Sequence, residues 1–328
     1  MLKKSKHTYL VTGAAGFIGA HVSKLLLGEG HCVIGIDSYN DYYDQRLKYY
    51  RINELEKNQD FKFYTGNIEK PEVLEPIFEK NQFAAIYNLA ARAGVRYSIK
   101  HPKSCMDTNA IGTLNVLDLM RKYGVKKLIL ASTSSLYAGQ KSPYREECSA
   151  NTPISPYAAS KKAAEIMAYT YHYLYNLDVS IVRYFTVYGP CGRPDMSIFR
   201  FIQWIKNEHP IQLFGDGSYS RDFTYIDDIA LGTVLARKSL GYEIINLGGG
   251  QQSVSILEII HRLENLLSKK AIIQYCDSHE ADMSRTCADI SKSKEMIGWC
   301  PQVSLDDGLK RTVDWHRENE EWVDKLHF

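Results

Sequence analysis

The sequence lacks the features that mark several large classes of protein. No apolar run reaches the roughly 18 residues of a membrane-spanning helix. Its 40 Lys and Arg residues nearly balance 38 Asp and Glu, so no general charge attracts nucleic acid or an anionic membrane. The seven cysteines form no CxxC pair, a pattern typical of reduced thiols rather than of a disulfide scaffold or a zinc site. We expect a cytoplasmic protein with no metal, no nucleic-acid partner and no membrane partner.

Two kinds of apolar segment alternate through the first half of the chain. Hydrophobic residues make up 45% of the sequence, which favours a buried core over disorder. Short runs rich in β-branched and aromatic residues are typical of strands buried on both faces. These runs cover residues 9–12, 32–36, 61–64, 84–89, 127–131 and 179–184, with amphipathic stretches such as 21–28, 108–123 and 157–175 between them. The alternation predicts an α/β fold with a Rossmann-type doubly wound parallel sheet.

After residue 184 the alternation gives way to Gly- and Pro-rich loops and shorter elements. We therefore predict a Rossmann domain over residues 1–184. Residues 225–248 are predicted to return to this domain and to add a helix at 227–240 and a strand at 243–247. Residues 185–224 and 249–328 are predicted to form a smaller C-terminal α/β lobe that binds the substrate.

The first predicted strand runs into a glycine-rich turn, YLVTGAAGFIG, that opens a helix. Glycines at 13, 16 and 19 permit a tight turn and close approach of the backbone to a pyrophosphate, with Phe17 and Ile18 at the helix start. Asp37 ends the second strand about 20 residues further on, where a carboxylate accepts hydrogen bonds from the adenosine ribose. The same charge repels a 2′-phosphate, which favours NAD over NADP.

The three-residue spacing of these glycines resembles that of the extended short-chain dehydrogenase/reductase superfamily. The resemblance implies that Asn67 and Ile68 flank the adenine, although Asp is more usual than Asn at the first position. It also implies that Leu89, Ala90 and Ala91 line the cofactor cleft.

A tyrosine and a lysine stand one helical turn apart in SPYAASK, at Tyr157 and Lys161. Free tyrosine, with a pKa near 10, is a poor base at neutral pH, and a neighbouring ammonium lowers that pKa. Chance alone gives roughly two YxxxK matches among the tyrosines, so the spacing is not diagnostic. Position favours Tyr157, because a strand and a hydroxyl-rich turn, 132–135, precede it. In the superfamily pattern Thr133 orients the reacting hydroxyl.

Four longer segments, 35–44, 88–102, 184–196 and 221–232, resemble nucleoside-diphosphate-sugar 4-epimerases, and the similarity continues through 288–301. They are most similar to the UDP-glucuronate 4-epimerases. The resemblance implies that Tyr157 removes the proton of the sugar 4-hydroxyl, that C4 passes a hydride to tightly bound NAD, and that Lys161 holds the nicotinamide ribose.

Related dehydratases carry an Asp-Glu pair after the catalytic Thr, and related decarboxylases carry a Glu two residues after it. This chain has Ser134 and Ser135 there, so a substrate carboxylate would meet hydroxyl donors rather than a like charge. Thr186 stands where most relatives have Asn. We expect these three hydroxyls to hold the carboxylate of a uronate sugar.

Three charged residues complete the expected UDP-sugar site. Arg221 is expected to bind the diphosphate, because a guanidinium matches phosphate oxygens in pairs. The resemblance implies that Asp282 binds the uridine ribose. Arg193 is expected to pair with the substrate, but a loop arginine before proline is also often a solvated surface group.

Several alternatives remain open at this stage. The first is an epimerase of a neutral sugar, UDP-glucose or a UDP-N-acetylhexosamine. The second is a decarboxylase of UDP-glucuronate, and the third is an inactive NAD-binding regulator. The tyrosine-rich stretch 38–51 is expected to be an exposed amphipathic helix rather than a nucleic-acid platform. By resemblance, helices 108–123 and 157–175 form a homodimer interface.

Overall fold

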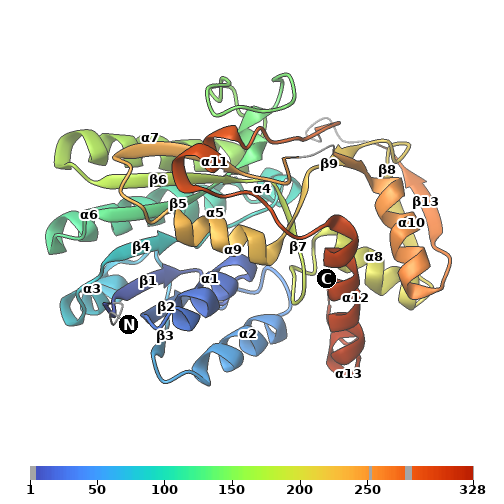
Figure 1. Cartoon of the computed structure of the whole chain (residues 1–328), viewed down its shortest axis with the longest axis horizontal. Coiled ribbons are helices and arrows are strands. Elements are labelled where there is room, and N and C mark those ends of the chain that lie inside the picture. The colour runs from blue at the N-terminus through green and yellow to red at the C-terminus, as the bar shows by residue number, and fades with distance from the viewer. Residues whose placement is uncertain (1–4, 251–252, 278–282, 328) are drawn as a thin grey trace.

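A single parallel sheet forms the centre of the computed structural model, which describes residues 5–250, 253–277 and 283–327 (Figure 1). Its strands are β1 (Thr8–Thr12), β2 (Cys32–Asp37), β3 (Phe61–Thr65), β4 (Ala85–Asn88), β5 (Lys127–Thr133), β6 (Asp178–Tyr184) and β11 (Tyr242–Leu247). They lie in the order β11-β6-β5-β4-β1-β2-β3, and every neighbouring pair is parallel. The predicted Rossmann-type sheet is confirmed, as is the return of the strand near 243–247, which pairs with β6.

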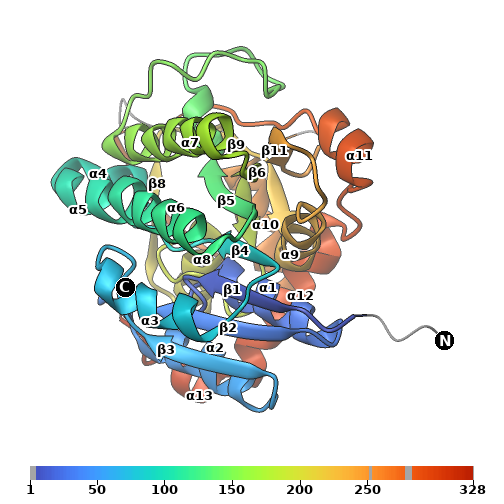
Figure 2. The same cartoon turned by 90° about the vertical axis from the view of Figure 1, so that its left-hand side faces the viewer.

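Helices cover both faces of this sheet (Figure 2), which is why every residue of the central strands β4 and β5 is buried. Alternate residues of each strand enter opposite apolar clusters: Val11 and Ile129 face one helical layer, and Leu10 and Leu128 face the other. The first layer contains α1 (Phe17–Gly28), α2 (Arg46–Glu56) and α9 (Ile226–Leu235). The second contains α3 (Pro71–Lys80), α6 (Gly112–Tyr123) and α7 (Pro156–Tyr175).

The predicted helices differ from the observed ones at particular points. The 108–123 helix starts with a π-helical turn, η1 (Asp107–Ile111), before α6. The helix predicted over 227–240 ends at Leu235, since turns that include Gly241, with a φ of +75°, lead into β11. Two short helices, α4 (Val95–Lys100) and α5 (Pro102–Met106), precede η1.

The remaining elements lie at one end of the sheet, to the right in Figure 1. They form two-stranded pairs of β7 (Thr186–Tyr188) with β10 (Phe223–Tyr225), β9 (Ser220–Arg221) with β12 (Val254–Ser255), and β8 (Pro210–Phe214) with β13 (Ile272–Cys276). The helices here are α8 (Ser197–Lys206), α10 (Ile256–Leu267), α12 (Leu305–Glu318) and α13 (Glu320–Val323). Helix α11 (Ser291–Ile297) lies instead beside β11 and α9, and a 3₁₀ turn, η2 (Ser134–Tyr137), follows β5. None of the helices in the described part of the chain is long and apolar enough to cross a membrane.

Candidate active site

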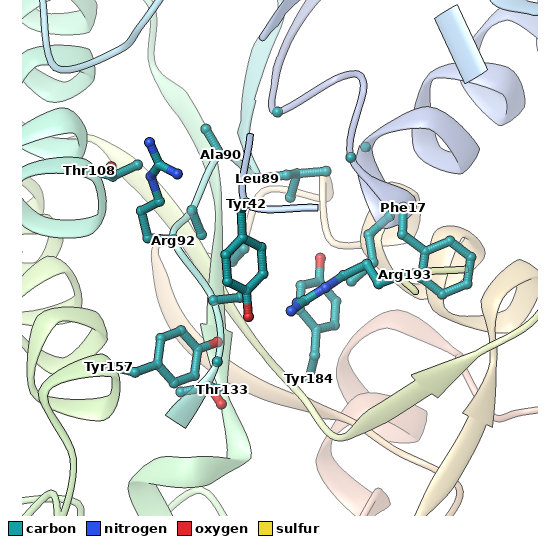
Figure 3. Close-up of a pocket in the computed structure, with 18 of the residues that line it drawn as sticks. Phe17, Tyr42, Leu89, Ala90, Arg92, Thr108, Thr133, Tyr157, Tyr184 and Arg193 are labelled. Carbon is teal, nitrogen blue, oxygen red and sulfur yellow. The ribbon is translucent and has the colours of Figure 1, made fainter. Parts of the chain in front are cut away.

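A cavity of about 690 Å³ opens where the parallel strands end at their carboxyl ends. This is the edge at which doubly wound sheets bind ligands. Every site residue predicted from the sequence lines this cavity, except Asp282, which lies outside the described residues. In Figure 3 the Tyr157 ring lies beside Thr133, across the cavity from Arg193 and Phe17, with Tyr42 between them.

The glycine turn between β1 and α1 leaves no space for side chains. Gly13 has a φ of +70°, and a Cβ built on it would lie 2.7 Å from the Ala90 nitrogen. A Cβ on Gly19 would lie 2.1 Å from the Gly13 oxygen. No side chain caps the start of α1 at Gly16, so its first backbone N–H groups remain available where the helix dipole favours an anion. The turn fits a dinucleotide diphosphate.

Asp37 lies at the end of β2, beside this turn. Its Oδ2 accepts from the Ala15 amide at 3.2 Å and its Oδ1 from the Tyr39 amide at 3.0 Å. Burial raises the pKa of the carboxyl, and the nearby Lys48 ammonium opposes that rise. Asp37 lines the cavity, and its contact with the adenosine ribose stays a prediction.

The tyrosine-rich stretch is not the exposed helix that we expected. Its first half is a loop whose Tyr42 lines the cavity, and α2 begins only at Arg46. Lys48 and Arg51, on α2, are each 3% exposed. Burial lowers the pKa of Lys48 to about 8, and its side chain also lines the cavity. The stretch turns inward because its polar groups find acceptors there: Lys48 Nζ donates to Asn40 Oδ1 at 2.9 Å.

The loop after β4 is fixed by two buried polar side chains. Thr12 Oγ1 accepts from the Leu89 and Ala90 amides, each at 3.1 Å. Asn109, in the π-helical turn, accepts from the Arg92 amide at 2.8 Å and donates to Ser160 Oγ at 2.8 Å. The π turn thus links this loop to the helix that carries Tyr157, a role for which π turns are often retained. Sequence reasoning missed Asn109, because no spacing rule identifies a π turn.

Asn67 and Ile68 lie beyond the end of β3, and both line the cavity. Asn67 Oδ1 accepts from the Glu69 amide at 3.0 Å, which fixes this turn, and Ile68 is buried. Their contact with the adenine stays a prediction.

Tyr157 and Lys161 point into the cavity from the first turns of α7. Burial raises the pKa of Tyr157, while its hydrogen bond with Thr133 and the charge of Arg193 lower it. Lys161 Nζ donates to the Ala131 carbonyl at 2.9 Å, and the expected lowering of the tyrosine pKa by Lys161 together with the nicotinamide ring stays a prediction. Burial lowers the pKa of Lys161 itself to about 8, against the opposing charge of Glu165.

The hydroxyl groups predicted to hold a carboxylate share one end of the cavity. Thr133 Oγ1 accepts from the Ser135 amide at 3.1 Å, as the 3₁₀ turn that contains Ser134 begins. Thr186 begins β7, and its amide donates to the Asp222 carbonyl at 3.1 Å. Arg221, on β9, also lines the cavity and donates from Nη1 to the Ser220 carbonyl at 2.9 Å.

Arg193 lines the cavity rather than the outer surface. It makes a two-point ion pair with Asp195, with Nε to Oδ1 at 3.0 Å and Nη2 to Oδ2 at 2.6 Å. Tyr42 Oη donates to the same carboxylate at 3.1 Å. The alternative of a solvated loop arginine is therefore wrong. Neither partner was predicted: Asp195 lies two residues from Arg193 in the same loop, whereas Tyr42 comes from a distant segment of the chain.

The acidic residues that line the described cavity are Asp37, Glu69 and Asp195. Asp37 accepts backbone hydrogen bonds, Glu69 accepts from Thr108, and Asp195 is paired with Arg193. None of them belongs to the Thr133 turn. Within residues 5–250, 253–277 and 283–327, no cluster of His, Cys, Asp or Glu is placed to hold a metal ion.

Comparison with known proteins identifies relatives along nearly the whole chain. The family model described as GDP-mannose 4,6 dehydratase matches residues 10–312. A protein of Thermodesulfobacterium geofontis named UDP-glucuronate 4-epimerase is 58% identical over 97% of this chain and 98% of its own.

Two solved structures have closely similar folds. The UDP-glucuronic acid 4-epimerase of Bacillus cereus, in complex with UDP-glucuronic acid and NAD, superimposes with a TM-score of 0.89 at 38% identity, covering 95% of this chain and 99% of that one. The UDP-glucose 4-epimerase of Thermotoga maritima, with UDP-glucose, gives 0.87 at 32% identity, with the same coverage of each chain.

Proposed function

The chain belongs to the GDP-mannose 4,6 dehydratase family of extended short-chain dehydrogenases/reductases, and from this premise we propose that it is a UDP-glucuronate 4-epimerase that uses NAD. It interconverts UDP-glucuronate and UDP-galacturonate. The similarity to the epimerases of T. geofontis and B. cereus extends over at least 95% of this chain, which supports both the substrate and the cofactor.

One observation separates this reaction from that of the dehydratases for which the family model is described. Dehydration at C6 needs carboxyl groups beside the catalytic Thr to move a proton and expel a hydroxyl. Here Thr133 is followed by two serines. The carboxyl groups that line the described cavity belong to other segments of the chain, and one of them, Asp195, is paired with Arg193. The site can orient a 4-hydroxyl but has no acid placed for elimination.

The chain's own residues account for the proton transfer. Tyr157 Oη takes the proton of the sugar 4-hydroxyl when the sugar is oxidised and returns it when the sugar is reduced. Thr133, which is hydrogen-bonded to Tyr157, orients the reacting oxygen. Lys161, held by the Ala131 carbonyl, has further N–H donors for the nicotinamide ribose. The chemistry that bound NAD would supply is to accept the hydride from C4 of the sugar and to donate it back, so no NAD is consumed.

A second group of residues anchors the two ends of the substrate. Arg221 binds the diphosphate, Asp282 binds the uridine ribose, and Arg193 lies near the reacting sugar. The anchored diphosphate lets the oxidised sugar turn its other face to the cofactor, which inverts the configuration at C4. Ser134, Ser135 and Thr186 hold the C6 carboxylate.

Holding the carboxylate also protects it. A 4-keto uronate is a β-keto acid, which loses CO₂ readily when the breaking bond aligns with the carbonyl π system. Hydroxyl groups that fix the carboxylate near the plane of the sugar ring keep that bond out of alignment. The three hydroxyls at one end of the cavity support this role.

We further propose that the protein is a cytoplasmic homodimer. On α7, Ile166, Tyr169 and Tyr173 are spaced along one face and are 53%, 51% and 74% exposed. Ile111 of η1 is 48% exposed, and η1 and α6 pack beside α7. Apolar side chains of this size along paired helices suit the four-helix interface expected of helices 108–123 and 157–175.

The proposal is tested by incubating purified protein with UDP-glucuronate and following the anomeric protons by NMR, without added NAD. We expect UDP-galacturonate to accumulate to a constant ratio, and Tyr157→Phe to abolish the conversion while the bound NAD remains. UDP-pentose and CO₂ would identify a decarboxylase. Conversion of UDP-glucose or UDP-N-acetylglucosamine alone would identify a neutral-sugar epimerase.

A further inference from the structure

Arg51 carries a buried positive charge that is hydrogen-bonded to no carboxylate among the described residues. Its side chain lies on α2 and is 3% exposed. Nη1 donates to the Ala15 carbonyl at 2.9 Å and to Tyr43 Oη at 2.7 Å. Nε and Nη2 donate to the Cys191 carbonyl at 3.1 and 2.7 Å, and Nη2 also donates to the Gly192 carbonyl at 3.0 Å. All four acceptor groups are neutral.

The three carbonyl acceptors belong to two loops that contribute residues to the active site, and Tyr43 lies in the loop before α2. Ala15 lies within the glycine turn, between Gly13 and Gly16, which is placed to bind the NAD diphosphate. Cys191 and Gly192 directly precede Arg193, which lines the cavity and which we have proposed lies near the reacting sugar. Arg193 and Phe17, the first residue of α1, lie on the same side of the cavity in Figure 3.

The loop before Arg193 needs an external support. Cys191 has a φ of +54°, a left-handed conformation that is strained for a non-glycine residue. Two of the five Arg51 hydrogen bonds end on the carbonyl of this residue. A planar guanidinium can bridge carbonyls of separate loops in this way because its donors have fixed directions, whereas a lysine ammonium is a point charge.

The charge of Arg51 is also unbalanced. Burying a guanidinium is costly unless an anion compensates it. The Asp37 carboxylate senses the charge, but its oxygens accept from the Ala15 and Tyr39 amides. Bound NAD would place its negatively charged diphosphate at the glycine turn. Arg51 contacts this turn directly, because its Nη1 donates to the Ala15 carbonyl.

We propose that Arg51 is a positioning residue that couples NAD retention to the placement of Arg193. Its charge strengthens binding of the dinucleotide diphosphate through the Ala15 peptide, and its forked donors hold the 191–192 loop so that Arg193 faces the substrate. The inference rests on the proposed function only for the identity of that substrate. Arg51 is the last residue of the tyrosine-rich stretch 38–51, which has no other role in the proposed reaction.

Two variants separate charge from geometry. Arg51→Lys keeps the charge but cannot bridge both loops, and Arg51→Met removes both properties. Arg46→Met is the matched control, because Arg46 lies on the same helix but does not line the cavity. Its side chain contacts Asp44 and the Lys325 carbonyl instead. Circular dichroism and thermal melting select the folded variants. Bound NAD is measured after acid release from the purified proteins, and UDP-glucuronate affinity by calorimetry in a Tyr157→Phe background with saturating NAD.

We expect Arg51→Met to lose NAD during purification and to bind UDP-glucuronate about tenfold more weakly, the size typical of coupled sites. Arg51→Lys should keep more NAD than Arg51→Met yet share its weak sugar binding. Normal NAD content and normal sugar affinity in folded Arg51→Lys would overturn the proposal, even if Arg51→Met failed to fold. So would equal losses in Arg46→Met. If the wild type does not convert UDP-glucuronate, the proposed function fails, while the NAD measurement still judges Arg51.

Discussion

Replacing Gly13 by alanine puts a methyl group where the glycine turn meets the loop after β4. The new Cβ would lie 2.7 Å from the Ala90 nitrogen, 2.8 Å from its Cα and 2.9 Å from the Leu89 carbonyl carbon. All three are backbone atoms, and the loop cannot withdraw freely because Thr12 holds both amides. The φ of +70° adds backbone strain to this overlap.

Gly124 provides a control with the same substitution and almost the same conformation. It caps α6 at a φ of 73°, and a Cβ there would have nothing within 4 Å. Gly124→Ala should therefore cost only the left-handed strain of about 1–2 kcal/mol. Gly13→Ala should cost that amount plus about 1–3 kcal/mol for overpacking. The difference between the two variants isolates the close approach.

Urea unfolding of NAD-free proteins measures this difference without the stabilisation that bound cofactor adds. A second measurement, the NAD content of the proteins as purified, reports on the turn itself. We expect Gly13→Ala to be the less stable variant and to lose its NAD, and Gly124→Ala to keep it. Equal free energies of unfolding together with equal NAD content would refute the reasoning that the turn is closed by contact with Ala90.

Three further outcomes follow from the structure. Thr186→Ala and Ser135→Ala should release UDP-pentose beside the epimer, detectable by NMR, and no extra UDP-pentose would refute the protection of the carboxylate. Burial lowers the pKa of His316 to about 3, against 6.5 for a free imidazole, so below pH 6.5 the unfolded chain binds a proton that the folded chain does not. Between pH 6.5 and 5 the urea stability of wild type should therefore fall by roughly 2 kcal/mol more than that of His316→Gln, at about 1.4 kcal/mol per pH unit, and parallel curves would contradict this. Ile166→Asp should give a folded monomer by light scattering if α7 forms the dimer interface, whereas an unchanged dimer would exclude this face.

Local sequence was sufficient for the parts of the fold that depend on one segment. Every residue of β4 and β5 is buried, as the apolar runs predicted, because a parallel strand covered on both faces needs no polar side. The glycine turn was predictable because close backbone approach excludes a Cβ at 13 and 19. Parallel strands end at one edge, so the residues after several strands were expected to meet.

The contacts that the sequence did not predict join segments far apart in the chain. Asn109 acts through a π turn, and Tyr42 reaches the carboxylate that pairs with Arg193 only when the loops after β2 and β7 meet. Arg51 was grouped with an exposed helix because charged residues usually face solvent. Its burial follows from carbonyl groups of two distant loops, which no pattern of residue types specifies. The domain limits near 184 and 248 stay predictions.

The measurement that tests the central claim most directly follows the hydrogen at C4. Protein purified without added NAD is incubated with UDP-glucuronate deuterated at C4, and the product is examined by NMR and mass spectrometry. Epimerisation by transient oxidation at C4 predicts UDP-galacturonate that keeps its deuterium at C4, in ordinary water and with no NAD supplied. UDP-galacturonate with hydrogen at C4, or no UDP-galacturonate at all, would contradict the account.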